Sequence, residues 1–178
     1  MNNFGIEGEK SPILKLISTD EKLVIKALDG MATIIYSQKT TFRTGVDFNF
    51  GSQDINRVSN PTGETLVNAY GLIRNAKFSE IYDSLSENLD KICFTQSQII
   101  DFCQNYSRHL VRSEHGNFFL SKKQCFYRGM EKYFIVRVVV HSPRSNVPTK
   151  KLDATFFEFA YEHALEVALC PRFFVPAI

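Results

Sequence analysis

Tryptophan, paired cysteines and long apolar runs are all missing from this chain. Of its 178 residues none is tryptophan and four are cysteine, and no apolar run approaches the roughly 20 residues needed to span a bilayer. Residues 1–10 have neither a basic start nor an apolar h-region, so we expect no signal peptide. The cysteines show no tight pairing, which favours reduced thiols. We therefore predict a cytoplasmic protein with no membrane partner.

Motifs for common catalytic and ligand-binding sites are also lacking. The chain has no Walker loop, no G-x-G-x-x-G and no C-x-x-C pair of the kind that usually nucleates a zinc site. Glu162-His163 lacks the second histidine that a zinc protease signature requires. Asp47 and Asp54 lack the spacing and the closing glutamate of a calcium loop. We accordingly predict no catalytic residues, no metal ligands and no cofactor.

The composition is otherwise that of a globular protein with an unusual aromatic balance. Sixteen phenylalanines and an apolar fraction of 44% predict a large core built from Phe side chains. A chain of this length is most simply one domain. We expect residues 1–10 to be disordered and residues 11–178 to form a single α+β domain.

The stretch from Thr95 to His141 is predicted to be the centre of that domain. Thr95 and Gln98 have the spacing of a helix capping box. The apolar residues that follow recur at intervals of three and four, as on one face of a helix of about five turns; they are Ile99, Phe102, Cys103, Tyr106 and Leu110. Residues 117–120 and 133–140 are rich in aromatic and β-branched side chains and predict two strands of a hairpin, with its turn at 128–131.

The regions on either side of this stretch predict further helices and extended segments. Residues 11–17 and 18–28 have helical apolar spacing, and 78–92 does as well. Residues 46–50 and 172–176 read as short extended pieces. Residues 155–169 alternate like a strand, but their alanine and glutamate content favours a helix, with a β-hairpin as the alternative. The predicted fold class is α+β, with an N-terminal helical part followed by a helix packed on a small, mostly antiparallel sheet.

Charge is distributed unevenly along the chain. Residues 1–90 contain 9 basic and 12 acidic side chains, whereas residues 107–151 contain 10 basic and only 2 acidic ones. The predicted binding residues are the cations of this basic segment; they are Arg108, Arg112, Lys122, Lys123, Arg128, Lys132, Arg137 and Arg144. Aromatic residues between them could stack on nucleic-acid bases, but they could equally face the core and leave the charges as a solvated surface.

These observations predict a function only at the level of class. We expect a non-enzymatic cytoplasmic binding or accessory module that acts through a basic helix–hairpin surface, within residues 95–141. A protein partner or a second copy of the chain is the expected partner. One alternative is a protein that binds RNA or single-stranded DNA. A second alternative is an enzyme whose site is assembled from scattered residues that no motif marks.

Overall fold

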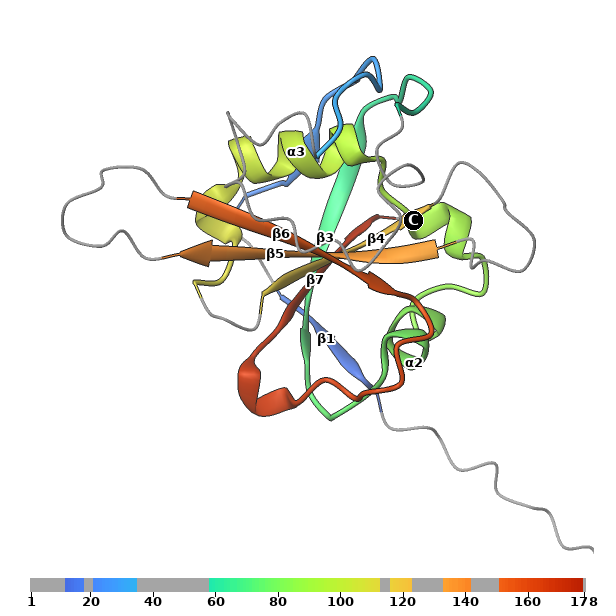
Figure 1. The fold of residues 1–178 in the computed structure, drawn as a ribbon, viewed down its shortest axis with the longest axis vertical. Coiled ribbons are helices and arrows are strands. Elements are labelled where there is room, and N and C mark those ends of the chain that lie inside the picture. The colour runs from blue at the N-terminus through green and yellow to red at the C-terminus, as the bar shows by residue number, and fades with distance from the viewer. Residues whose placement is uncertain are drawn as a thin grey trace, which may run out of the picture.

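The computed structural model describes residues 12–17, 21–34, 58–112, 116–122, 133–141 and 151–177, and these residues are organised around one seven-stranded mixed sheet (Figure 1). The strands are β1 (Leu14–Leu16), β2 (Val24–Ile25), β3 (Thr65–Leu72), β4 (Asn117–Lys122), β5 (Tyr133–His141), β6 (Lys151–Glu158) and β7 (Arg172–Pro176). Their order across the sheet is β1-β3-β7-β4-β5-β6, and β2 also pairs with β3. The helical elements are α2 (Phe78–Asp83), η2 (Leu89–Ile92), α3 (Gln96–Asn105), η3 (Ser107–His109) and η4 (Val167–Leu169).

The last strand, β7, lies in the middle of the sheet. It runs antiparallel to β3 and parallel to β4. Its sequence, RFFVP, is buried from the second residue onward, as expected for a strand covered on both faces. The register places Phe118 of β4 beside Phe173 of β7, and Phe119 beside Phe174. Because successive side chains point to opposite faces, one of these phenylalanine pairs lies on each face of the sheet.

Two hydrophobic clusters therefore cover the two faces of the sheet. On the first, which we call the α3 face, Ile99, Phe102 and Cys103 of α3 pack with Phe119 and Phe174. The opposite face contains Phe118 and Phe173 and is covered by α2, by η2 and by residues 159–171, which we call the strap. In Figure 1, α3 and α2 lie on opposite sides of β4, β5 and β6. We call this second face the strap face.

The beginning of α3 confirms the predicted capping box. The Thr95 side chain accepts a hydrogen bond from the Gln98 amide, and the Gln98 side chain accepts one from the Thr95 amide. This reciprocal pair satisfies two of the backbone donors that a helix start leaves without partners. The predicted length was wrong, since α3 has ten residues and ends at Asn105. The apolar spacing continues to Leu110, but that side chain enters the same cluster from the irregular chain after η3.

The strands predicted at 117–120, 133–140 and 172–176 are confirmed as β4, β5 and β7. β4 and β5 pair antiparallel from Asn117 opposite Val138 to Lys122 opposite Tyr133. Within the predicted helix at 78–92, α2 and η2 are helical and are separated by an irregular segment. The predicted disorder of residues 1–10, the strand at 46–50 and the turn at 128–131 lie outside the described residues.

The predicted fold class is wrong, because β-structure dominates the described chain and the N-terminal helical part is absent from it. β1 and β2 occupy the segments for which helices were predicted, and both pair with β3. β1 has three residues and β2 has two, so the apolar spacing within each is too short to distinguish a strand from a helix. An isolated helix of that length would not be stable either. Their conformation follows from hydrogen bonds to β3, such as that from the Ile17 amide to the Ala69 carbonyl at 2.8 Å.

The helix favoured for residues 155–169 is also wrong, and so is the hairpin alternative. β6 pairs with β5 from His141 opposite Lys151 to Phe134 opposite Glu158, and then the chain leaves the sheet as the strap. Helix propensity is a weak preference of less than about 1 kcal/mol per residue. It is outweighed here by a ladder of backbone hydrogen bonds and by burial of Leu152, Ala154 and Phe156 on the α3 face.

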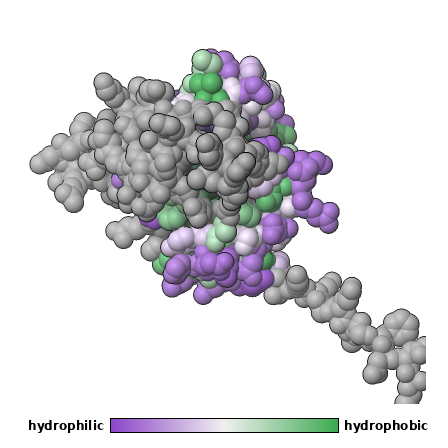
Figure 2. Space-filling view, turned by 45° about the vertical axis from the view of Figure 1, so that its right-hand side comes forward, coloured by the Kyte–Doolittle hydropathy of each residue, from purple (hydrophilic) through white to green (hydrophobic). Residues whose placement is uncertain are grey.

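The described surface is mostly hydrophilic, with hydrophobic side chains in separate small areas on the side that Figure 2 shows. Large apolar residues that are exposed include Leu16, Met31, Val58, Leu66 and Ile73. In the described part of the chain, no helix has both the length and the apolar character needed to cross a membrane.

Candidate functional site

A pocket of about 340 Å³ lies on the strap face of the sheet. Its floor consists of one residue from each of three adjacent strands, Phe118 of β4, Arg137 of β5 and Phe157 of β6. Phe118 of β4 lies directly opposite Arg137 of β5. Phe157 of β6 lies opposite Ile135, which is two residues before Arg137 on the same face of β5. The walls come from α2 and from the strap; they are Phe78, Tyr161, Leu165, Glu166, Leu169 and Pro171.

Aromatic rings surround one side of this pocket. The Phe78 ring centroid lies 5.3 Å from that of Phe118, 6.1 Å from that of Phe157 and 6.4 Å from that of Tyr161. The Phe157 and Tyr161 rings meet edge to face at 5.6 Å. Tilted and edge-to-face contacts at these distances are favourable and fix ring positions. The pocket is thus bounded by aromatic surfaces whose orientation the surrounding packing determines.

Arg137 contributes the only positive charge among the described residues that line the pocket. The side chain is partly buried, and its Nε is shielded from solvent. Gly116 makes room for it: a Cβ at this position would lie 2.7 Å from the Arg137 Cγ. Gly116 also has a φ of +87°, which L-residues with side chains rarely adopt. The glycine before β4 therefore lets the arginine stem lie against the backbone.

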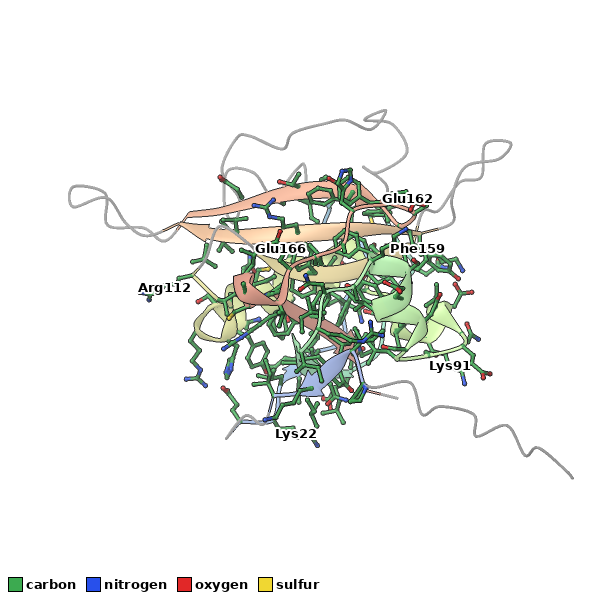
Figure 3. The ribbon with its side chains drawn as sticks, turned by 90° about the horizontal axis from the view of Figure 1, so that it is seen from below. Lys22, Lys91, Arg112, Phe159, Glu162 and Glu166 are labelled. Atoms are coloured by element: carbon green, nitrogen blue, oxygen red, sulfur yellow. The ribbon has the colours of Figure 1, made fainter. Side chains whose placement is uncertain are left out.

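The strap is held over the pocket by contacts with the segment before and at the start of α2. The Leu165 amide donates to the Ala76 carbonyl at 2.8 Å, and the Val167 amide donates to the Asn75 Oδ1 at 2.8 Å. Lys77 and Glu162 form an ion pair at the surface. This ion pair lowers the pKa of the Glu162 carboxyl and raises that of Lys77. Figure 3 shows the strap, with Glu162 and Glu166 labelled, crossing in front of the sheet.

The basic residues predicted to form one binding surface lie in different places. Arg108 is exposed in η3 and pairs with Glu21, which also lies 2.9 Å from His109 Nε2. Arg112 is exposed just before β4, and Lys122 is at the other end of that strand, 3.2 Å from Asp90. A six-residue strand separates its ends by about 16 Å.

Lys122 pairs with Asp90, which is the neighbour of Lys91 in η2. In Figure 3, Arg112 and Lys91 lie on opposite sides of the molecule. Arg137 lies in the pocket instead of on a shared basic surface. The remaining predicted residues lie outside the described part of the chain; they are Lys123, Arg128, Lys132 and Arg144. The described cations therefore do not converge on one helix–hairpin surface.

The aromatic residues of the basic segment are core residues where the structure describes them. Phe118 is 2% exposed and Phe119 is 0% exposed, so neither offers an open ring for base stacking. Tyr133 is partly buried and donates a hydrogen bond of 2.7 Å to Asp90. The alternative in which these rings face the core is the one observed at these positions.

The cysteines differ in exposure. Cys103 is buried on the inner side of α3, as its apolar spacing predicted, and burial raises the pKa of its thiol. Cys93 is partly buried, and Cys170, between two residues that line the pocket, is exposed. Among the described residues no three or more His, Cys, Asp or Glu side chains come together in a way that could hold a metal ion.

No protein-family model, curated protein sequence or solved structure matches this chain. The class that can be stated is therefore structural: in its described residues, a mixed-sheet protein with α3 packed on one face and a strap-covered aromatic pocket on the other. Sequence reasoning missed the pocket because its residues come from α2, three strands and the strap. The one available signal was Arg137, a lone charge inside the otherwise apolar run of β5.

Proposed function

We propose that this protein is a non-enzymatic binding module whose ligand is a small molecule held in the strap pocket. The observation that carries the proposal is the aromatic-lined pocket of about 340 Å³ between the sheet and the strap. Ligand pockets typically enclose about 300–1,000 Å³ and combine apolar walls with a few polar groups. Phe78, Phe118, Phe157 and Tyr161 supply the apolar walls, and Arg137 and Glu166 supply the polar groups.

A binding role is favoured over catalysis by the chemistry of the lining residues. Among those described, Arg137, Glu166 and Tyr161 are the ones that carry ionisable groups. Nucleophilic catalysis needs a nucleophile within hydrogen-bond reach of a base, and general acid–base catalysis needs a positioned proton donor or acceptor. The described lining residues include no Ser, Thr, Cys, His or Lys, and their one carboxylate, Glu166, is exposed. The predicted cytoplasmic location belongs to the same proposal, and the free thiols of Cys103 and Cys170 support it.

Binding of N-phenyl-1-naphthylamine, an uncharged probe with a naphthalene and a phenyl group that fluoresces in apolar sites, tests the proposal. Leu169 lines the pocket, whereas Val167 in the same turn of η4 is exposed and does not. We expect Leu169→Trp to fill the pocket and weaken probe binding about tenfold or more, which corresponds to about 1.4 kcal/mol. Val167→Trp is the matched control and should leave the affinity nearly unchanged.

Two outcomes of this experiment would contradict the proposal. The first is the absence of saturable binding to the unmodified protein. The second is an equal loss of affinity in both tryptophan variants, since a probe on the outer surface would not distinguish Leu169 from Val167. Circular dichroism and thermal unfolding of each variant show whether the fold is retained.

Nucleic-acid binding is a second proposal, and the charge of residues 107–151 favours it, with 10 basic and 2 acidic side chains. Contacts with phosphates would make the affinity fall steeply and log-linearly with salt concentration. The test is titration of labelled RNA and single-stranded DNA over a salt series, with charge reversal at Lys122, Lys123 and Arg128. No binding at low salt would contradict this second proposal.

A further inference from the structure

We propose that the strap pocket selects an anionic ligand, a small molecule with a flat apolar body and one carboxylate, sulfonate or phosphate group held by Arg137. This inference rests on the proposed function, because it concerns the same pocket. Its basis is the position of Arg137 on the pocket floor, directly opposite Phe118 and beside Phe157 on the neighbouring strand. Phe118 is buried, whereas Phe157 is only partly buried, so a ligand against the Phe157 ring would place a terminal acidic group against the guanidinium.

The environment of Arg137 holds this charge in a defined place. Its stem lies against Gly116, with no room for a Cβ there, and its Nε is shielded from solvent. A charge in such a partly desolvated position acts more strongly than one on an open surface, because the effective dielectric constant is lower. The planar fork of a guanidinium matches a carboxylate or phosphate with two parallel hydrogen bonds.

Two carboxylates lie near this arginine and bear on the argument. Glu166 lines the pocket from the strap, but it is exposed, so water and salt screen its charge. On β6, Thr155 lies directly opposite Arg137. Asp153 and Phe157 are on the same face of this strand, two residues before and two residues after Thr155, so they lie on opposite sides of Arg137. A guanidinium has several N–H donors pointing in different directions, so some can bind groups of the protein while others bind a ligand beside Phe157.

The shape of the pocket determines the rest of the ligand. The partly buried Phe157 and the exposed Tyr161 present ring surfaces that meet edge to face, and the buried rings of Phe78 and Phe118 pack behind them. Flat aromatic or conjugated molecules gain offset-stacked and edge contacts in such a setting. At about 340 Å³ the pocket is near the lower limit for small-molecule sites, which suits a body of one or two rings.

A matched pair of probes tests the charge preference. 8-Anilinonaphthalene-1-sulfonate has the same ring system as N-phenyl-1-naphthylamine and adds one sulfonate. We expect the unmodified protein to bind the sulfonate probe about tenfold or more tightly than the neutral probe, as a charge-assisted hydrogen bond would provide. Raising the salt concentration should weaken binding of the sulfonate probe and leave that of the neutral probe unchanged.

Variants at Arg137 connect the preference to this residue. Arg137→Met keeps the stem and removes the charge, and it should remove the preference for the sulfonate while the neutral probe still binds. Arg137→Lys keeps the charge without the planar fork and should retain part of the preference. Arg112→Met is the control, because Arg112 is an exposed arginine that does not line the pocket, and it should change neither affinity.

The outcomes separate this inference from the proposed function. Binding of neither probe contradicts both. Equal affinity of the two probes for the unmodified protein, or an Arg137→Met variant that retains the preference, overturns the inference and leaves the pocket as a neutral ligand site. If Arg137→Met does not fold, the comparison of the two probes and their salt dependence on the unmodified protein still decides the question.

Discussion

Two stacked phenylalanine pairs at the centre of the sheet have nearly the same ring geometry, but they lie on opposite faces and are covered by different segments. Phe119 and Phe174 stack at 5.2 Å and 18° on the α3 face, and Phe118 and Phe173 stack at 5.3 Å and 19° on the strap face. The first pair is closed by Phe102 of α3, whose centroid is 4.7 Å from that of Phe174. The second is covered partly by α2 and partly by an irregular strap, and a pocket remains beside it.

The difference shows how one sheet can have one face covered by a regular helix and another face that retains a pocket. A regular helix presents side chains at fixed spacings and fills the space above a sheet. The strap presents fewer inward side chains, since residues 162–164 are exposed and do not line the pocket, and it is held by a few hydrogen bonds. Rigid strands then supply the floor of a site whose walls come from a more loosely attached segment.

The largest expected effect comes from truncating the two adjacent phenylalanines of β4. Phe119→Ala should cost about 3–5 kcal/mol of unfolding free energy, because the closed α3 face cannot collapse onto the cavity. Phe118→Ala should cost about 1 kcal/mol less, because the cavity would merge with an existing pocket and the strap can move inward. Urea unfolding of both variants measures the difference. A larger loss for Phe118→Ala would contradict the contrast between the two faces.

A smaller effect is expected at Tyr82 of α2, on the strap face. Its side chain is fully buried between Phe159 and Phe173, and its hydroxyl has no hydrogen-bond partner among the described residues. Burial, with a smaller contribution from Cys93, raises the pKa of this phenol well above its usual value. Tyr82→Phe should therefore leave stability unchanged or raise it by up to about 1 kcal/mol. Thermal unfolding measures this change, and a clear destabilisation would reveal a partner for the hydroxyl.

The smallest effect concerns the attachment of the strap at low pH. The Lys77 ammonium lowers the pKa of Glu162 in the folded protein, so the ion pair stabilises the fold above the unfolded pKa of the glutamate. That contribution is lost as the pH falls through the lower folded value, between about pH 5 and pH 3. Because the pair is exposed, Glu162→Gln should be only slightly less stable than the unmodified protein at pH 7. The difference should disappear at the acidic end of a pH series of urea titrations, and a constant difference would contradict this account.

Local signals predicted several elements correctly. The Thr95–Gln98 capping box marked the start of α3, and the β-branched run after Tyr133 marked β5. Both signals act within a few residues and need no distant partner. The segments that were predicted wrongly, β1, β2 and β6 with the strap, take their conformation from strands remote in sequence.

The predicted basic binding surface remains a prediction, and its described cations lie apart for a related reason. A count of charges along residues 107–151 contains no information on where each charge lies. Lys122 pairs with Asp90 of η2 and Arg108 with Glu21, both far away in the sequence. Alternation along β5 directs Arg137 to the strap face, where it lines the pocket. Its neighbours in the pocket come from segments as distant as Phe78 and Leu169.

By itself the sequence determined the Phe-built core, the capped helix, the central strands and the uneven charge, since composition and short-range spacing decide these. Only the tertiary structure decided that residues 172–176 form the central strand β7, that α3 packs on Phe119 and Phe174, and that a pocket lies beside Phe118. The physical reason is that strand pairing and pocket walls depend on contacts between residues far apart in the chain. Local propensities of less than about 1 kcal/mol per residue cannot determine such contacts.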